Sequence, residues 1–323
     1  MKKVSLIFPV YNVAFCVENS LLSALSQTYE NIEYVIIDDR GEDDSMKIVY
    51  RSCNNYPQKN IKIIDHGVNK GLGATRNTGI KYASGDYILF MDSDDILEKT
   101  AIQQFIDSLD DDYDMVVGSY VRKVQTKEYP LHLKNEVLDR EILYHYLVGK
   151  KYYPQVWNKL YKLSFIKENS LSFIEKCNHE DNPFTFYFSA CNPKVRILAT
   201  ITYQWIFRTE SVTSVYREKN VEDLLSGYKF MCDVARKFSI SDLYVIRYLN
   251  NFRLFPLWLL LKRIVISKQE NTLLMGLMEP VSSFESINQL RMPFKEKLKF
   301  MIFYLPFSLK KMILKIISCT QNV

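Results

Sequence analysis

The segment Tyr87-Ile88-Leu89-Phe90-Met91-Asp92-Ser93-Asp94-Asp95 joins a short apolar run directly to three carboxylates. An apolar run of this length is typical of a strand that is buried on both faces. Asp92 and Asp94 are two residues apart, so in an extended chain both side chains project to the same side. Hard divalent cations prefer such a pair, completed by water and phosphate oxygens. Alone, the cluster also fits a solvated acidic turn or a helix N-cap.

The same kind of apolar run recurs through the first 120 residues, and each run is followed by a helical pattern. The predicted strands are 4–10, 32–38, 61–65, 86–92 and 114–120, and the predicted helices are 17–27, 44–53, 74–82 and 100–109. This alternation predicts βαβ units and therefore a mainly parallel sheet with helices on both faces. Ligands of such sheets bind outside the carboxyl ends of the strands, so we expect the chemistry there.

Beyond residue 120 the pattern is mixed. It predicts a helical stretch over 136–148, a helix that opens near Glu180, and two apolar strand-like runs that end at Arg208. From about Val221 the strand signals fade and helical patterns rich in Leu, Ile, Phe, Lys and Arg follow. We therefore predict a catalytic α/β domain over 1–215 and a helical C-terminal region over 216–323.

Composition narrows the class of protein. The chain has 323 residues, of which 47% are hydrophobic and 24% charged, so it is long enough for one or two packed domains. A net charge of +5 is too modest to favour nucleic-acid binding. Six scattered cysteines without C-x-x-C spacing argue against a zinc site or a disulfide framework and indicate a reduced, cytoplasmic protein.

The sequence offers no membrane-crossing segment. Lys2-Lys3 and the apolar residues after them resemble a secretory signal, but Pro9 and Asn12 interrupt the run and no small-residue cleavage site follows. No uncharged apolar run approaches the roughly 20 residues that a transmembrane helix needs.

Two further motifs lie at predicted strand ends. Asp38-Asp39 closes the second strand, where a carboxylate can accept hydrogen bonds from a nucleobase imide or a ribose hydroxyl; Gly41 nearby equally favours a turn. The stretch 69–77 resembles a phosphate loop in composition but lacks both the G-K-[ST] ending and the G-x-G-x-x-G pattern. Its glycines alternatively shape the turn before a helix, with Arg76 as a surface charge.

Order and spacing make these motifs specific, because they follow one another along a single predicted sheet edge. Phe8-Pro9-Val10-Tyr11-Asn12, Ile37-Asp38-Asp39, the stretch 69–79 and the stretch 85–95 together resemble the nucleotide-sugar domain of family 2 glycosyltransferases. The resemblance is to the capsule and exopolysaccharide branch, is strong over the first third of the chain and weaker to about Ser214. It implies the GT-A fold and inversion at the anomeric carbon.

The resemblance also implies roles for single residues. Asp94 and Asp92 would hold Mn²⁺ or Mg²⁺, and the donor nucleotide would contact Pro9, Tyr11, Asn12, Asp38, Asp39, Arg76 and Asp92. In this pattern Pro9 and Tyr11 border the uracil and Asp39 reads its imide. One departure is visible: the family often has Asp-Asp-Gly-Ser after the second strand, whereas this chain has Asp38-Asp39-Arg40-Gly41 with Ser45 displaced.

Three later segments resemble acceptor-side and catalytic elements of the same family. Glu180-Asp181 resembles the acidic pair that supplies the general base, which we assign to Asp181; without the upstream motifs the pair also fits two acids at a helix N-terminus. Trp157 lies in a Trp-Asn-Lys-Leu-Tyr segment and either stacks on an acceptor sugar or is a core aromatic. Arg208, with Ser211 and Ser214, resembles a loop that closes over the diphosphate.

The C-terminal region carries two stretches, 252–266 and 294–317, in which Lys and Arg alternate with large apolar residues. A basic amphipathic helix of this kind either lies in the headgroup layer of an anionic membrane or packs on the catalytic domain. The resemblance favours peripheral contact with the cytoplasmic face of the cell membrane, because such enzymes commonly extend glycans on a polyprenyl-diphosphate carrier.

These features predict an inverting transferase that moves a sugar from UDP-hexose or UDP-N-acetylhexosamine to a hydroxyl of a growing, lipid-linked cell-surface glycan. Two alternatives remain open. A sugar-1-phosphate nucleotidyltransferase is disfavoured because Pro9-Val10-Tyr11-Asn12 stands where that class has a glycine-rich loop. A non-catalytic nucleotide-sugar-binding or assembly subunit is disfavoured by the intact set of Asp92, Asp94 and Asp181.

Overall fold

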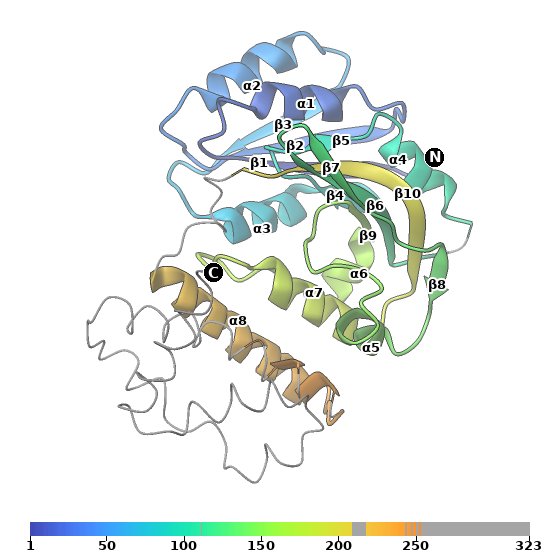
Figure 1. Cartoon of the computed structure of the whole chain (residues 1–323). Coiled ribbons are helices and arrows are strands. Elements are labelled where there is room, and N and C mark those ends of the chain that lie inside the picture. The colour runs from blue at the N-terminus through green and yellow to red at the C-terminus, as the bar shows by residue number, and fades with distance from the viewer. Residues whose placement is uncertain (111, 209–217, 243, 247, 250–251, 253–323) are drawn as a thin grey trace, which may run out of the picture.

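The computed structural model describes residues 1–110, 112–208, 218–242, 244–246, 248–249 and 252. These residues build one ten-stranded sheet with helices on both faces (Figure 1). The strand order is β3-β2-β1-β4-β9-β6-β10-β5, with β7 paired to β6 and β8 paired to β10. The predicted α/β fold is therefore present, and its sheet is mixed rather than parallel throughout.

The N-terminal half follows the predicted alternation. Its elements are β1 (Val4–Val10), α1 (Val17–Leu25), β2 (Ile32–Asp38), α2 (Ser45–Asn54), β3 (Asn60–Asp65), α3 (Leu72–Tyr82) and β4 (Tyr87–Phe90). All four strands are parallel, and every residue of β1, β2 and β4 is buried. Val10 lies beside Asp38, and Asp38 beside Asp65, so the strands end together at one edge.

The second half closes the sheet with mixed pairing. Its elements are β5 (Ile96–Leu97), α4 (Ala101–Asp107), β6 (Met115–Val124), β7 (Lys127–Leu131), β8 (Glu136–Leu138), α5 (Ile142–Leu147), β9 (Lys159–Lys162), α6 (Leu163–Glu168), α7 (Asp181–Ala190), β10 (Val195–Ile206) and α8 (Glu218–Lys237). The short strand β9 is antiparallel to both neighbours, β4 and β6. Only β6 and β10 continue the parallel pattern in this half of the described chain.

Two sequence-based expectations are corrected here. The stretch 136–148 is not one helix, because Glu136–Leu138 pairs with the edge of β10 before α5 begins at Ile142. The two strand-like runs before Arg208 are one strand, β10, whose register against β6 shifts between Ile197 and Tyr203. An irregularity of this kind interrupts the hydrophobic pattern without ending the strand.

Helices cover the two faces unequally. Figure 1 shows α1 and α2 on one side of the sheet and α3, α6 and α7 on the other. The helix α8 packs on α7, where Gly227 lies against Pro183, and its Asp223 accepts a hydrogen bond at 3.0 Å from the backbone of Asn178 in the loop before α7. The predicted boundary at 215/216, Ser211, Ser214 and the two basic amphipathic stretches, apart from Phe252, lie outside the described residues.

The described part of the chain bears on the membrane-spanning helices and on the cysteines. No helix in this part is both long enough and apolar enough to cross a bilayer. Of the cysteines within it, Cys16, Cys53, Cys177 and Cys191 are free thiols.

Candidate active site

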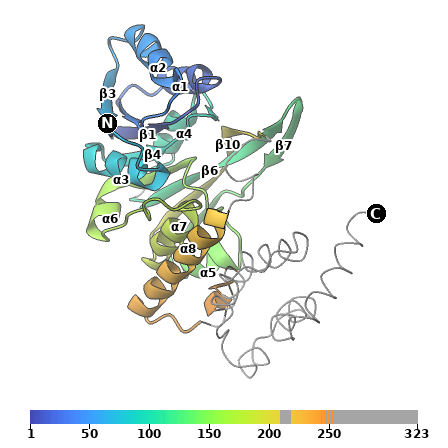
Figure 2. The same ribbon diagram turned by 90° about the vertical axis from the view of Figure 1, so that its left-hand side faces the viewer.

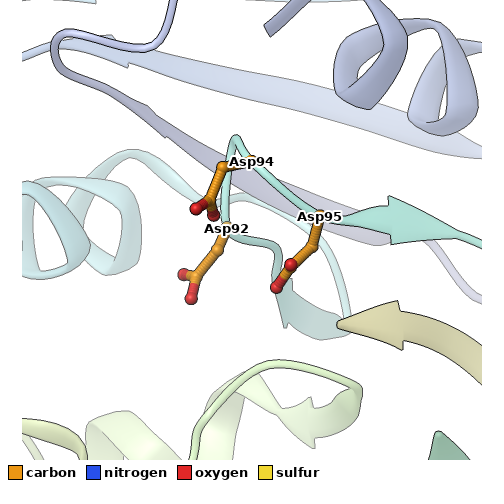
Figure 3. Close-up of side chains that lie close together, drawn as sticks. All are labelled: Asp92, Asp94 and Asp95. Carbon is orange, nitrogen blue, oxygen red and sulfur yellow. The ribbon is translucent and has the colours of Figure 1, made fainter. Parts of the chain in front are cut away.

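Three carboxylates gather directly after β4. One oxygen from each of Asp92, Asp94 and Asp95 lies within 4.8 Å of the others, and Figure 3 shows the three side chains around one turn. Asp95 is 2% exposed and accepts hydrogen bonds from the Tyr203 hydroxyl at 2.9 Å and the Ile206 backbone at 2.8 Å. Asp95 thus fixes the turn to β10, while the half-buried Asp92 and Asp94 remain accessible to a ligand.

Arg76 connects this turn to the start of α7. Its guanidinium is almost fully buried; Nη2 donates to Asp92 Oδ1 at 2.8 Å and Nη1 forms an ion pair with Glu180. The face of the guanidinium also lies 5.5 Å from the ring centre of Phe173. Arg76 is therefore not a surface charge, and its contacts with two carboxylates position Asp92 and Glu180; its predicted contact with the nucleotide stays a prediction.

Glu180 and Asp181 have different surroundings although they are neighbours. Glu180 is 4% exposed and held by Arg76. Burial raises the pKa of Glu180 to about 7, and the negative charges of Asp181 and Asp92 add to this shift. The positive charge of Arg76 opposes it. Asp181 is the first residue of α7, half-buried, and accepts hydrogen bonds on Oδ1 from Asn182 alone within the described chain. Of the two, Asp181 has the carboxylate available to a substrate.

Arg208 contacts the other side of the cluster. Its Nη1 lies 2.6 Å from Asp94 Oδ2, and its Nη2 donates to the Asp94 carbonyl oxygen at 2.6 Å. The guanidinium also lies 5.2 Å from the ring centre of Phe15, a side chain that is 71% exposed. Burial, together with the charge of Asp92, raises the pKa of Asp94 to about 6 despite this arginine. Arg208 thus places a positive charge beside the closely spaced carboxylates of Asp92, Asp94 and Asp95.

The chain itself supplies four hydrogen-bonding partners to the Asp39 carboxylate. Its Oδ1 meets His66 Nδ1 at 2.7 Å and the Lys70 backbone N–H at 2.9 Å; its Oδ2 meets Asn69 Nδ2 at 3.0 Å and the Gly71 N–H at 2.9 Å. A carboxylate offers about four acceptor sites, so these donors fill it. Asp39 therefore shapes the loop that leads into α3, and its assignment to the uracil imide stays a prediction.

The remaining residues of the predicted nucleotide site lie around this loop. Pro9 is buried near the end of β1, and Tyr11, directly after the strand, is 48% exposed and open to stacking. Asn12 Oδ1 accepts the Glu42 N–H at 2.7 Å, so Asn12 braces the turn after β2. Asp38 is 8% exposed, and its Oδ1 accepts a hydrogen bond from the Arg40 N–H at 2.8 Å. Tyr11 and Asn12 are therefore the exposed residues among these four, and Tyr11 is the exposed aromatic.

The Trp157 side chain belongs to the core. It is 4% exposed, its ring stacks on Tyr203 with centroids 4.8 Å apart, and Tyr120 meets it edge-on at 4.9 Å. Of the two interpretations of Trp157, the geometry favours the core aromatic. Tyr203 was not among the residues predicted for the site, because nothing local marks a tyrosine whose partner, Asp95, lies more than 100 residues earlier.

Comparisons with known proteins point to one family. The family model described as "Glycosyl transferase family 2" matches residues 5–172, more than half of the chain. EpsH of Bacillus subtilis (strain 168), described as a putative glycosyltransferase, is 32% identical over 235 residues, which cover 70% of this chain and 67% of EpsH. Asp181 and Arg208 lie beyond the residues that the family model matches.

Solved structures match the fold. The crystal structure of residues 1–349 of Staphylococcus aureus TarS in complex with UDP has a TM-score of 0.60 at 21% identity, covering 89% of this chain and 78% of that one. TarS is a poly(ribitol-phosphate) beta-N-acetylglucosaminyltransferase, and the chain spans about a third of its full length. The mannosyltransferase PcManGT from Pyrobaculum calidifontis, in complex with GDP-Man and Mn²⁺, has a TM-score of 0.55 at 12% identity, covering 96% and 87% of the two chains.

Proposed function

This chain belongs to glycosyl transferase family 2, and we propose that it transfers a sugar from a nucleotide-sugar to a glycan hydroxyl with inversion of the anomeric carbon. The observation that carries the proposal is the Arg76 bridge. It ties Asp92, one of the carboxylates of the cluster, to Glu180, the neighbour of Asp181. Two chemically different carboxylate groups, one for a cation and one for a proton, are thereby held on the same rim of the sheet.

The carboxylate cluster fits a divalent cation. Asp92 and Asp94 offer hard oxygen ligands, and the half-exposed cluster leaves room for water and phosphate oxygens. We propose that Asp94 and Asp92 hold Mn²⁺ or Mg²⁺, which when bound supplies positive charge to the leaving diphosphate. The chain itself contributes Arg76, which keeps Asp92 in place.

Asp181 is the proposed general base. It stands at the N-terminus of α7, and its carboxylate accepts the proton of the acceptor hydroxyl as that oxygen attacks the anomeric carbon. Glu180 cannot take this role while Arg76 holds it in the interior, so it positions the start of α7 instead. A single displacement of this kind needs no covalent enzyme intermediate.

For the donor and acceptor we propose the narrower assignments that the sequence predicts. The donor is UDP-hexose or UDP-N-acetylhexosamine, with the exposed Tyr11 against the base. TarS, similar in fold, has been solved with UDP and with UDP-GlcNAc, which supports a uridine nucleotide. The acceptor is a growing glycan on a polyprenyl diphosphate at the cytoplasmic face of the membrane, with the C-terminal region in peripheral contact.

The test is nucleoside diphosphate release from a panel of UDP- and GDP-sugars, with Mn²⁺ or with EDTA. We expect metal-dependent release from one UDP-sugar and a loss of at least about 10³-fold in Asp181→Asn and in Asp94→Ala. Asp181→Asn should still bind UDP in a calorimetric titration. Asp44→Asn is the matched control, because Asp44 is exposed and pairs only with Lys47 in the described chain.

Other outcomes would redirect the proposal. Release of pyrophosphate from a nucleoside triphosphate would identify a nucleotidyltransferase. Folded protein that binds no nucleotide and turns over no donor, even with lipid-linked acceptors present, would identify a non-catalytic subunit.

A further inference from the structure

A row of large side chains crosses three strands beyond the carboxylate cluster. In the sheet register Arg122 of β6 lies opposite Tyr129 of β7 and beside Trp205 of β10. Side chains at directly paired positions project from the same face of a sheet. Phe207, two residues after Trp205, adds a fourth member, with ring centroids 6.3 Å from Trp205. These four residues, Arg122, Tyr129, Trp205 and Phe207, are called the aromatic–arginine surface below.

Arg122 lacks a counterion in this surface. Its guanidinium carbon lies 5.0 Å from the ring centre of Trp205 and 4.4 Å from that of Phe207. Its Nε is buried without a hydrogen-bond partner, and no carboxylate in the described part of the chain pairs with the side chain. A guanidinium that is partly desolvated by aromatic rings keeps its charge and its planar set of donors. Phosphate and carboxylate groups match that set.

The surface is accessible to a ligand. Tyr129 is 52% exposed, and Arg122, Trp205 and Phe207 are half-buried. Figure 2 shows β6 and β7 extending away from the body of the sheet. Aromatic rings presented in this way offer a flat apolar face, which suits the C–H side of a sugar ring or a polyol, next to a charge that suits an acidic group.

The surface is continuous with the candidate active site. Tyr203, two residues before Trp205, donates to Asp95, and Arg208, directly after Phe207, pairs with Asp94. It also lies on the α7 side of the sheet. Tyr120 contacts both Trp205 and Trp157, and the loop before Trp157 meets α7 through the hydrogen bond from Thr185 Oγ1 to the Pro154 carbonyl at 2.5 Å.

We propose that the aromatic–arginine surface binds the acceptor and selects a glycan that carries a negative charge beside a sugar or polyol unit. Arg122 binds a phosphate or carboxylate oxygen of that glycan, and the rings of Tyr129, Trp205 and Phe207 contact its carbon skeleton. The inference rests on the proposed function only in calling the bound glycan an acceptor. Binding itself can be measured without turnover.

Calorimetric titration with three probes tests the proposal on the full chain. The probes are a ribitol-phosphate oligomer, an oligogalacturonate and the neutral maltoheptaose, which distinguish phosphate, carboxylate and no charge. We expect at least one charged probe to bind and Arg122→Gln to weaken it roughly tenfold, the loss of one charge-assisted hydrogen bond. Arg196→Gln is the matched control, because Arg196 lies at the other end of β10 and also has a buried, unpartnered Nε.

Tyr129→Ala provides a second variant at an exposed position, where misfolding is not expected. It should weaken binding of the charged probe severalfold. Equal affinity for charged and neutral probes, or equal effects of Arg122→Gln and Arg196→Gln, would overturn the proposal. Binding without any sugar transfer would refute the proposed function and leave the surface as an anionic-glycan site.

Discussion

Arg208 pairs with Asp94, one of the two carboxylates proposed to bind a cation, so arginine and cation would compete for this side chain. Because the side chains of Arg208 and Asp94 are 23% and 39% exposed, the pair is only partly desolvated and its replacement is inexpensive. We expect Arg208→Gln to raise the affinity of the donor-free protein for Mn²⁺ about two- to fivefold, as measured by electron paramagnetic resonance titration. Arg40→Gln, which removes a charge paired with Asp65 instead, serves as the control. Equal changes in both variants would show that Arg208 does not compete for Asp94.

Glu33 in β2 gives the fold a pH dependence. Burial alone would raise its pKa, but hydrogen bonds from Lys3, Ser5 and Ser84 outweigh burial and lower the pKa from 4.5 to about 2. The unfolded chain therefore binds a proton first as the pH falls. The contribution of Glu33 to stability is complete above pH 4.5 and disappears between pH 4.5 and about 2.

Urea unfolding of Glu33→Gln at several pH values checks this. The variant should be less stable than the parent by about 1–2 kcal/mol at pH 7, allowing for partial solvent screening, and the difference should shrink below pH 4.5. The exposed Glu18, paired with Arg51, is the control, and Glu18→Gln should change stability by less than about 0.5 kcal/mol. A difference that stays constant down to pH 3 would contradict the assignment.

At this scale the sequence predicted residue positions better than side-chain contacts. Asp92 and Asp94 follow β4 and Asp181 begins α7, as predicted, because strand ends and helix starts have local signals. The contacts of Asp39, Arg76 and Trp157 could not be predicted, since each depends on partners that come from elsewhere in the chain. No local pattern reveals that four donors fill Asp39 or that Tyr203 covers Trp157.

Among the elements, α3 depends on close approach to the loop before α7. A methyl group at Gly73 would overlap the backbone carbonyl of Ile174, which cannot rotate away. Alanine favours a helix over glycine by about 1 kcal/mol, and overpacking against backbone outweighs this gain. We expect Gly73→Ala to lower the free energy of unfolding by about 1–2 kcal/mol in urea titrations.

The matched change lies in α8. A methyl group at Gly227 would be 3.7 Å from Pro183, an ordinary contact, so Gly227→Ala should leave stability unchanged or raise it by up to about 1 kcal/mol. Similar destabilisation by both substitutions would show that helix propensity or helix ends, rather than the Ile174 contact, decide the result.

Element type was predictable where segments are long and periodic. The strands β1 to β4 and the helices between them were identified with small errors at their ends, because β1, β2 and β4 are buried apolar runs and the segments alternate regularly along the chain. The strands β7, β8 and β9 were not identified, since they are three to five residues long and owe their pairing to neighbouring strands. Their absence from the prediction is why the sheet was expected to be mainly parallel.

Over the whole molecule, β9 makes the two halves one sheet. Because β9 pairs with β4 on one side and β6 on the other, neither half retains its full set of ladder hydrogen bonds alone. We expect one cooperative urea transition, with the same midpoint by far-UV circular dichroism and by the fluorescence of Trp157 and Trp205 in a Trp258→Phe background. An earlier fluorescence transition would show that the second half unfolds separately.

The position of β9 in the sequence also determines when β4 gains its second partner during translation. About 70 residues separate Phe90, the end of β4, from Lys159, the start of β9. At roughly 5–20 residues per second the ribosome needs about 4–14 s to produce them. During that interval β4 has a partner on one side only, and an unpaired strand edge is a template for other chains. Nascent chains on ribosomes that translate the same messenger RNA are therefore most prone to pair with each other before β9 has been synthesised.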